Sequence, residues 1–189
     1  MADPHHIPTL DAHDVRTVVL YRLGLSLAAT SVLFGACAQL FLPISDPTMY
    51  GLALGVSAGI SCCVVNLHLY NKTIRWVINS AASAGAWVLA VAFVIDTHEW
   101  HHILMHGGLG LCFVSLSALA LKEQFCFRIP GLRAVPIFLA TSVLLGVMHW
   151  PIAHGVALLP AGLLLFVLCV AKWRMPLGHD IGNKAHYEV

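Results

Sequence analysis

Histidine is the residue type in this sequence whose number and placement point most directly to chemistry. The 189-residue chain contains 12 histidines. Neutral imidazole is the commonest metal ligand in proteins, and it suits zinc, copper and iron. Six histidines lie near the ends of apolar segments in the second half of the chain: His98, His101, His102, His106, His149 and His154. These six are the first candidates for a binding site.

The segment from residue 97 to residue 106 has helical spacing. At ~100° per residue, His98, His102 and His106 fall within roughly 80° of one another, on a single helix face. Glu99 borders that face. An acid at this position suits a metal ligand, or a group that hydrogen-bonds to one.

Two further histidines flank the short connection that Trp150 and Pro151 predict between two apolar segments. His149 precedes the proline and His154 follows it, so both can lie at the same depth as the first group. The sequence therefore predicts a transition-metal site for zinc, copper or iron, with these candidate ligands: His98, His102, His106, His149, His154 and Glu99.

Two enzyme motifs overlap in this run. Residues 98–102 read H-E-x-x-H, as in zinc hydrolases, and also H-x-x-H-H, as in membrane desaturases. His149 and His154 resemble the H-x4-H box of the desaturases. Intramembrane metalloproteases also carry an Asp-Gly element, yet no aspartate occurs between Asp96 and Asp180. A metal-dependent hydrolase or oxidase is therefore an alternative to simple metal binding.

Two other interpretations of the histidines stay open. A b-type haem could lie between helices with His106 and His149 as axial ligands. Alternatively, the histidines could anchor helix ends at the headgroup level, as Trp100 and Trp150 beside them do. The chain would then serve as a non-catalytic assembly or scaffold subunit of a membrane complex.

The composition places this chemistry in a membrane. The chain is 59% hydrophobic and 10% charged, with a mean hydropathy of +0.82, whereas soluble domains carry about 25% charged residues. We predict an all-α, polytopic bundle of six transmembrane helices within residues 18–171, between an N-terminal tail (1–17) and a C-terminal tail (172–189). The six apolar stretches are residues 18–42, 49–70, 74–95, 103–121, 132–150 and 153–171.

The basic residues predict the orientation of the bundle. Threaded through six spans, all ten fall on the side of the two termini: Arg16, Arg22, Lys72, Arg75, Lys122, Arg128, Arg133, Lys172, Arg174 and Lys184. Short basic loops stay in the cytoplasm, so we expect both termini there, in a multi-pass protein of the inner membrane. The basic residues never cluster, which gives no support for nucleic-acid binding. The expected partners are the lipid bilayer and either another membrane protein or a second copy of the chain.

Two smaller features carry structural expectations. Gly51, Gly55 and Gly59 share one helix face, where small residues let helices approach closely. On the cytoplasmic side, Glu123 is expected to pair with Lys122 or Arg128, or alternatively with His68.

Three short segments also resemble a known family. They are residues 67–70 (LHLY), residues 122–127 (KEQFCF) and residues 181–184 (IGNK). Together they resemble a family of uncharacterised integral membrane proteins of bacteria, common in cyanobacteria and related plastids. The resemblance implies an integral membrane protein and brings no established activity, so it assigns no catalytic residues.

Overall fold

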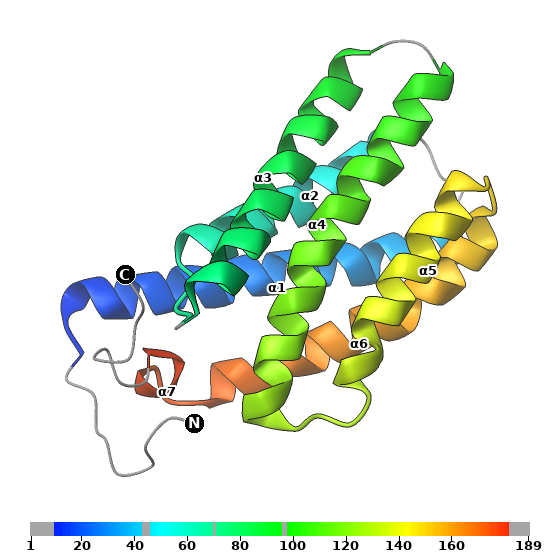
Figure 1. Cartoon of the computed structure of the whole chain (residues 1–189). Helices are drawn as coiled ribbons and strands as arrows, with labels where there is room; N and C mark the ends of the chain where they lie inside the picture. The colour runs from blue at the N-terminus through cyan, green and yellow to red at the C-terminus, as the bar shows by residue number, and fades with distance from the viewer. Residues whose placement is uncertain (1–9, 43–45, 70, 96–97, 182–189) are drawn as a thin grey trace.

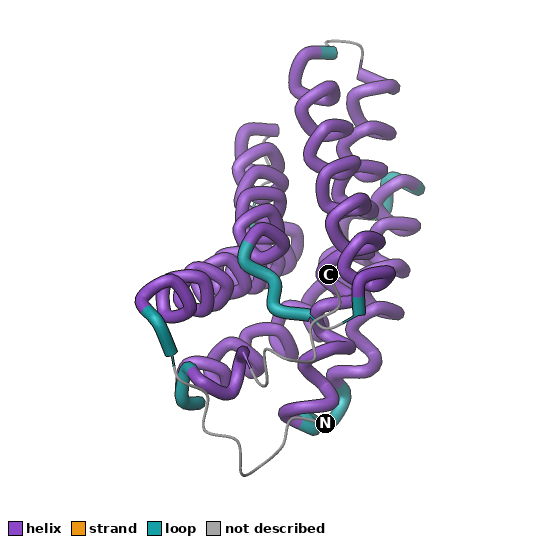
Figure 2. Tube along the Cα trace, turned by 60° about the vertical axis from the view of Figure 1, so that its left-hand side comes forward, coloured by secondary structure: helices purple, strands orange, loops and turns teal. Residues whose placement is uncertain are grey.

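The regular structure of the chain is helical. The computed structural model describes residues 10–42, 46–69, 71–95 and 98–181, with the backbone alone for residues 46–48, 98 and 99. Within these ranges every regular element is a helix, which confirms the all-α prediction (Figure 2). The elements are α1 (Ala12–Phe41), α2 (Asp46–Val65), α3 (Lys72–Val94), α4 (His98–Phe127), the 3-10 turn η1 (Leu132–Ala134), α5 (Val135–Val147), α6 (Pro151–Arg174) and α7 (Gly178–Ile181).

The long helices have the dimensions of membrane spans. Among the described residues, α1, α3, α6 and the Trp100–Phe127 part of α4 are long and apolar enough to cross a bilayer. The segments Met49–Val65 and Leu132–Val147 are shorter apolar helices. Each of the six predicted apolar stretches thus contains an α-helix, and four of these helices are long and apolar enough to cross a membrane.

The helices pack as neighbouring pairs (Figure 1). The most extensive contacts between helices join α1 to α2 and to α6, α3 to α4, and α5 to α6. Leucine and isoleucine fill the core between them, including Leu25, Ile60, Leu116 and Leu165. The α5–α6 turn lies at the end of the bundle opposite to α7, which returns to contact α1. This arrangement creates two separate ends at which polar side chains from several helices meet.

Glycines set the spacing between α1 and α2. A Cβ atom on Gly59 would lie 2.6 Å from the backbone nitrogen of Ala28, and one on Gly24 would lie 2.6 Å from the carbonyl oxygen of Gly59. A Cβ on Gly55 would also collide with a side chain of α1, whereas one on Gly51 would meet nothing within 4 Å. The expected close approach is therefore confirmed for Gly55 and Gly59 and wrong for Gly51.

Replacing Gly59 by valine should destabilise the protein far more than replacing Gly51 by valine. Overpacking at the Gly59 contact should cost about 1–3 kcal/mol, because the backbone of α1 cannot move aside without breaking its other contacts. Thermal unfolding of both variants in the same detergent measures the difference. Equal melting temperatures for the two variants would contradict the proposed helix contact.

Candidate functional site

Four of the predicted ligands meet where α4, α5 and α6 come together. His102 and His106 lie one turn apart on α4, His149 follows the end of α5, and His154 lies in the first turn of α6. The His102 and His149 rings are stacked with centroids 3.8 Å apart. The His102–His106 and His106–His154 centroid distances are 4.3 and 5.8 Å. We call these four residues the histidine cluster.

Two backbone carbonyls fix the tautomers of the buried members of the cluster. The Nδ1 atom of His154 lies 2.7 Å from the carbonyl oxygen of Ser142, and the Nδ1 atom of His106 lies 2.9 Å from that of His102. A carbonyl oxygen can only accept, so both Nδ1 atoms donate a hydrogen. In a neutral ring the Nε2 atom then carries a free lone pair, the form that binds a metal ion.

His149 takes its place in the cluster through an unusual backbone conformation. Its φ of 58° lies in the left-handed region, at the helix-capping position that glycine usually occupies. The cap is complete, because the amide of His149 donates to Gly146 and that of Trp150 donates to Leu145, both at 3.0 Å. A side chain in this conformation costs about 1–2 kcal/mol relative to glycine. The conformation positions the imidazole of His149 against His102.

Gly146 leaves the room that two of the rings occupy. A Cβ atom at this position would lie 2.5 Å from Nε2 of His106 and 2.9 Å from Nδ1 of His154. Neither separation is compatible with a real side chain. A glycine in α5 is therefore required for the rings of α4 and α6 to approach each other.

The remaining histidine of the run points elsewhere. Nδ1 of His101 bonds the carbonyl oxygen of Ala92 at 2.8 Å, and its ring packs edge-on against Tyr50 at 5.1 Å. His101 thus faces α2 and α3, while His102 faces α5. This division separates two histidines that a desaturase-type H-x-x-H-H box would bring to one site. The side chains of the two other predicted ligands, His98 and Glu99, lie outside the described residues.

A tighter set of potential metal ligands lies at the start of α1. Among the described residues, three ligand atoms within 4.8 Å of one another occur at Asp11, His13 and Asp14, and not within the histidine cluster. Here the two carboxylates already form a capping box. Asp14 N donates to Asp11 Oδ1 at 2.7 Å, and Asp11 N donates to Asp14 Oδ2 at 3.1 Å. We therefore interpret this group as a helix cap.

A network of buried charges lies at the opposite end of the bundle. Glu123 accepts hydrogen bonds from Tyr21 at 2.8 Å and from Lys172 at 2.9 Å. Asp180 of α7 accepts from Arg22 Nε at 2.7 Å and forms an ion pair with Lys172. The four charged side chains are at most 5% exposed. We call these five residues the ion network.

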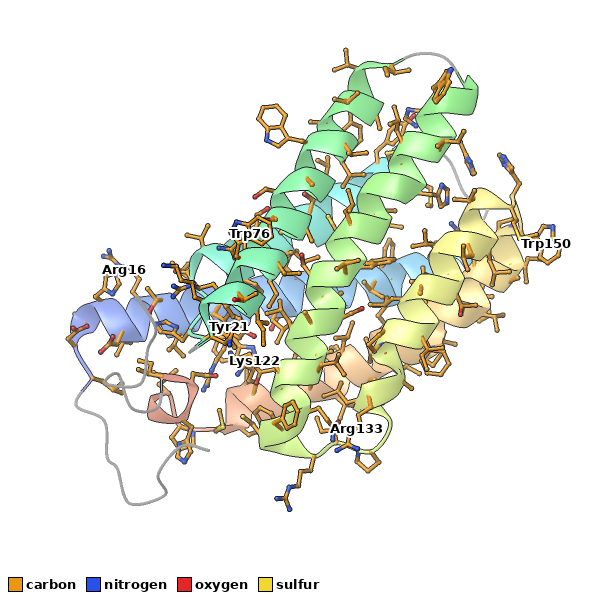
Figure 3. All side chains as sticks on the ribbon, viewed as in Figure 1. Arg16, Tyr21, Trp76, Lys122, Arg133 and Trp150 are labelled. Atoms are coloured by element: carbon orange, nitrogen blue, oxygen red, sulfur yellow. The ribbon has the colours of Figure 1, made fainter. Side chains whose placement is uncertain are left out.

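The surroundings of the ion network agree in part with the sequence. Glu123 pairs with Lys122 at 3.4 Å, as expected, and the Lys122 ammonium lies 5.0 Å from the ring of Tyr21 (Figure 3). His68 instead contacts Thr17, with 3.4 Å between Nε2 and Oγ1. Burial, and next the charge of Lys122, lower the pKa of His68 below its usual value. His68 therefore belongs to the polar surroundings of the network.

The sequence identifies only Glu123 as a member of the ion network and misses the other four, Tyr21, Arg22, Lys172 and Asp180. The two basic residues serve there only to predict the orientation of the bundle, and Asp180 falls in the predicted C-terminal tail. The available signal was the position of Arg22, one turn or more inside an apolar run. A charge at such a depth needs an opposite charge inside the protein.

Comparison with known proteins adds the family. The family described as "Uncharacterized integral membrane protein (DUF2301)" matches residues 62–189. The chain belongs to this family. A Haemophilus influenzae relative, described as an uncharacterized protein, is 35% identical over 189 residues and covers 100% of both chains. No solved structure matches the chain. The DUF2301 match covers the whole histidine cluster, together with Glu123, Lys172 and Asp180 of the ion network.

Replacing Asp180 by alanine should strongly destabilise this DUF2301 protein. The change leaves Arg22 and Lys172 buried side by side without their shared carboxylate, and breaking a buried pair in this way costs about 3–5 kcal/mol. Asp11→Ala, which removes an exposed helix cap, is the matched control and should cost only about 1 kcal/mol. Chemical unfolding in detergent measures the free energy of unfolding of both variants. Equal losses of this free energy would contradict the importance of Asp180 in the ion network.

Proposed function

We propose that this chain is a membrane protein that binds a transition-metal ion through a histidine layer, which consists of the histidine cluster together with His98 and Glu99. The supporting observation is the pair formed by His106 and His154. Both rings are buried, both donate Nδ1–H to a backbone carbonyl, and their centroids are 5.8 Å apart. Two imidazoles that share one zinc ion have centroids about 5–6 Å apart, given zinc–nitrogen bonds of about 2.0 Å.

The hydrogen bonds to the carbonyls are the outer contacts that metal-binding histidines ordinarily make. They orient the ring, fix the tautomer and raise the basicity of the coordinating nitrogen. The strained conformation of His149 supports the same proposal. Backbone strain of this kind persists where a side chain has a task, because glycine would relieve the strain but would lose the ring that stacks on His102.

The rest of the coordination shell is drawn from the same layer. His102 lies in ring contact with His106 of the pair, and His149 stacks on His102. His98 precedes His102 by one helical turn, and Glu99 follows His98 in the sequence. Histidine nitrogen, with or without a carboxylate, suits zinc, copper or iron. In the haem alternative, iron would be held by paired imidazoles of this layer.

The proposal also includes a membrane topology. Six apolar helices cross the inner membrane with both termini in the cytoplasm, and the histidine layer lies near the opposite face. Figure 3 shows Arg16, Lys122 and Arg133 toward one end of the bundle and Trp150 at the other, as this orientation requires. The two shorter helices need a thinned bilayer or flanking polar residues to span it.

Metal content tests the proposal directly. Tag-free protein, stripped with a chelator and reloaded with zinc, should retain about one ion per chain, since a single His106–His154 pair is present. His106→Gln and His154→Gln should lose it, while His5→Gln combined with His6→Gln in the tail should keep it. Gly146→Ala should also weaken binding, because its methyl group takes the space of both rings. Gly107→Ala is the matched control, since a Cβ there meets nothing within 4 Å.

Elemental analysis and the visible spectrum report the outcome. A Soret band would show bound haem and would favour the haem alternative over the transition-metal proposal. Folded protein that takes up no metal, and that co-purifies with other membrane proteins, would contradict metal binding and favour an assembly role.

A further inference from the structure

A groove lies on the outside of the bundle between α1 and α6, whose long helices run side by side (Figure 1). It holds about 310 Å³ of accessible space and is open to the surroundings of the bundle. Because this bundle is a membrane domain, the molecules that meet this face are lipids. Short side chains of α1 and larger side chains of α6 line the groove, among them Ser26, Thr30, Phe166, Val170, Trp173 and Arg174.

The middle of the groove presents a mainly apolar surface. The hydroxyl groups of its α1 wall turn back onto their own helix, where Ser26 donates to the carbonyl oxygen of Arg22 and Thr30 to that of Ser26, both at 2.8 Å. A hydroxyl group has one hydrogen to donate, so neither has one left for a ligand. On the α6 wall, Phe166 and Val170 expose apolar side chains. This part of the groove suits a hydrocarbon chain.

A tryptophan and an arginine lie at one end of the groove. Nε1 of Trp173 donates to Oγ of Ser26 at 2.9 Å, which holds the indole ring against α1. Arg174 is the last residue of α6, a helix long and apolar enough to cross a bilayer, and its side chain is exposed. Tryptophan and arginine at the end of a span lie at the depth of the lipid headgroups. This end of the groove therefore faces headgroups, and the middle faces acyl chains.

The charge of Arg174 is available to a ligand. Within the part of the chain that the structure describes, Arg174 forms no ion pair. The carboxylates of the ion network, at the same end of the bundle, are already paired with their own basic partners. A guanidinium group matches a phosphate group with two parallel hydrogen bonds, so its natural partner at this depth is a lipid phosphate.

We propose that this groove binds one anionic phospholipid, with its headgroup on Arg174 and an acyl chain between α1 and α6. From Arg174 back to Phe166 the groove follows about two turns of α6, roughly 12 Å, and passes from charged to apolar as a lipid does. A zwitterionic lipid also carries a phosphate, but the positive charge of its headgroup is repelled by the arginine. The inference requires only that the bundle lies in a bilayer and is independent of the metal proposal.

The experiment compares two lipids with the same acyl chains on the purified full-length protein. Delipidated protein in a neutral detergent is titrated with dioleoyl phosphatidylglycerol or with dioleoyl phosphatidylcholine. A lipid that binds only the folded state raises the melting temperature in a saturable way. The phosphatidylglycerol should bind about fivefold more tightly, the preference expected from a single basic residue at the headgroup level. Equal affinities would overturn the proposal, and so would a dimer that covers the groove and excludes both lipids.

Arginine variants connect the preference to the groove. Arg174→Gln should make the affinities for the two lipids equal. Arg133→Gln is the matched control, because Arg133 is also exposed and lies toward the Lys122 end of the bundle but does not line the groove (Figure 3). This control should keep the preference. A preference that survives Arg174→Gln, or that Arg133→Gln reduces equally, would overturn the proposal, because the attraction would then be diffuse.

A second pair of variants tests the acyl-chain part and leaves Arg174 in place. Thr30→Phe fills the groove and should weaken the binding of both lipids. Leu27→Phe is its matched control, because Leu27 is also an exposed residue of α1 but does not line the groove. Unchanged lipid binding in Thr30→Phe would overturn the proposal. All four variants should keep the zinc content of the parent protein, so this test and the metal test can fail separately.

Discussion

The hydrogen bond from His154 to the carbonyl of Ser142 joins α6 to α5 and determines what the histidine cluster can do. A carbonyl within a helix already accepts from the amide four residues later, here that of Gly146, and its second lone pair remains available. Because Gly146 has no side chain, the imidazole can reach that lone pair. The absence of a Cβ atom on Gly146 therefore allows this hydrogen bond between α6 and α5. The hydrogen bond fixes the tautomer of His154, and that tautomer leaves the Nε2 lone pair available for a metal ion. In hydrocarbon no water competes for these groups, so such bonds have to be made inside the protein.

The two ends of the bundle provide partners for their buried polar groups through different chemistry. At one end, imidazole rings bond to backbone carbonyls and contact one another. At the other, Arg22 and Lys172 balance Glu123 and Asp180, so four buried charges sum to zero. Buried ion pairs add little stability compared with apolar packing, but they are costly to break. The ion network therefore fixes the position of α7 against α1 and α6 more than it stabilises the fold. At the histidine end, the Nε2 atoms of His106 and His154 present lone pairs that a metal ion could use.

Much of this arrangement follows from the sequence, and the missing parts have identifiable causes. Apolar runs and helical spacing predicted the helices, the shared face of His102 and His106, and the approach of His149 and His154 around Pro151. They could not predict that His101 turns toward Ala92, because adjacent residues on a helix point in directions ~100° apart and only tertiary packing decides which one faces α5. Asp180 lies eight residues beyond Lys172, so its return to Arg22 depends on a chain reversal that local patterns do not encode. Gly51 is a second case in which a local pattern is not sufficient. The glycine repeat does not show that Gly55 and Gly59 contact α1 closely while Gly51 does not.

Ring-nitrogen NMR of the metal-free protein, with ¹⁵N-labelled histidine, tests the central claim most directly. Single His→Gln variants assign the signals of His106 and His154. We predict that both rings are neutral near pH 7, with the hydrogen on Nδ1 and a pyridine-type Nε2, and that added zinc shifts the Nε2 signals selectively. Rings that carry the hydrogen on Nε2, or that are protonated on both nitrogens, would contradict this description of the histidine cluster.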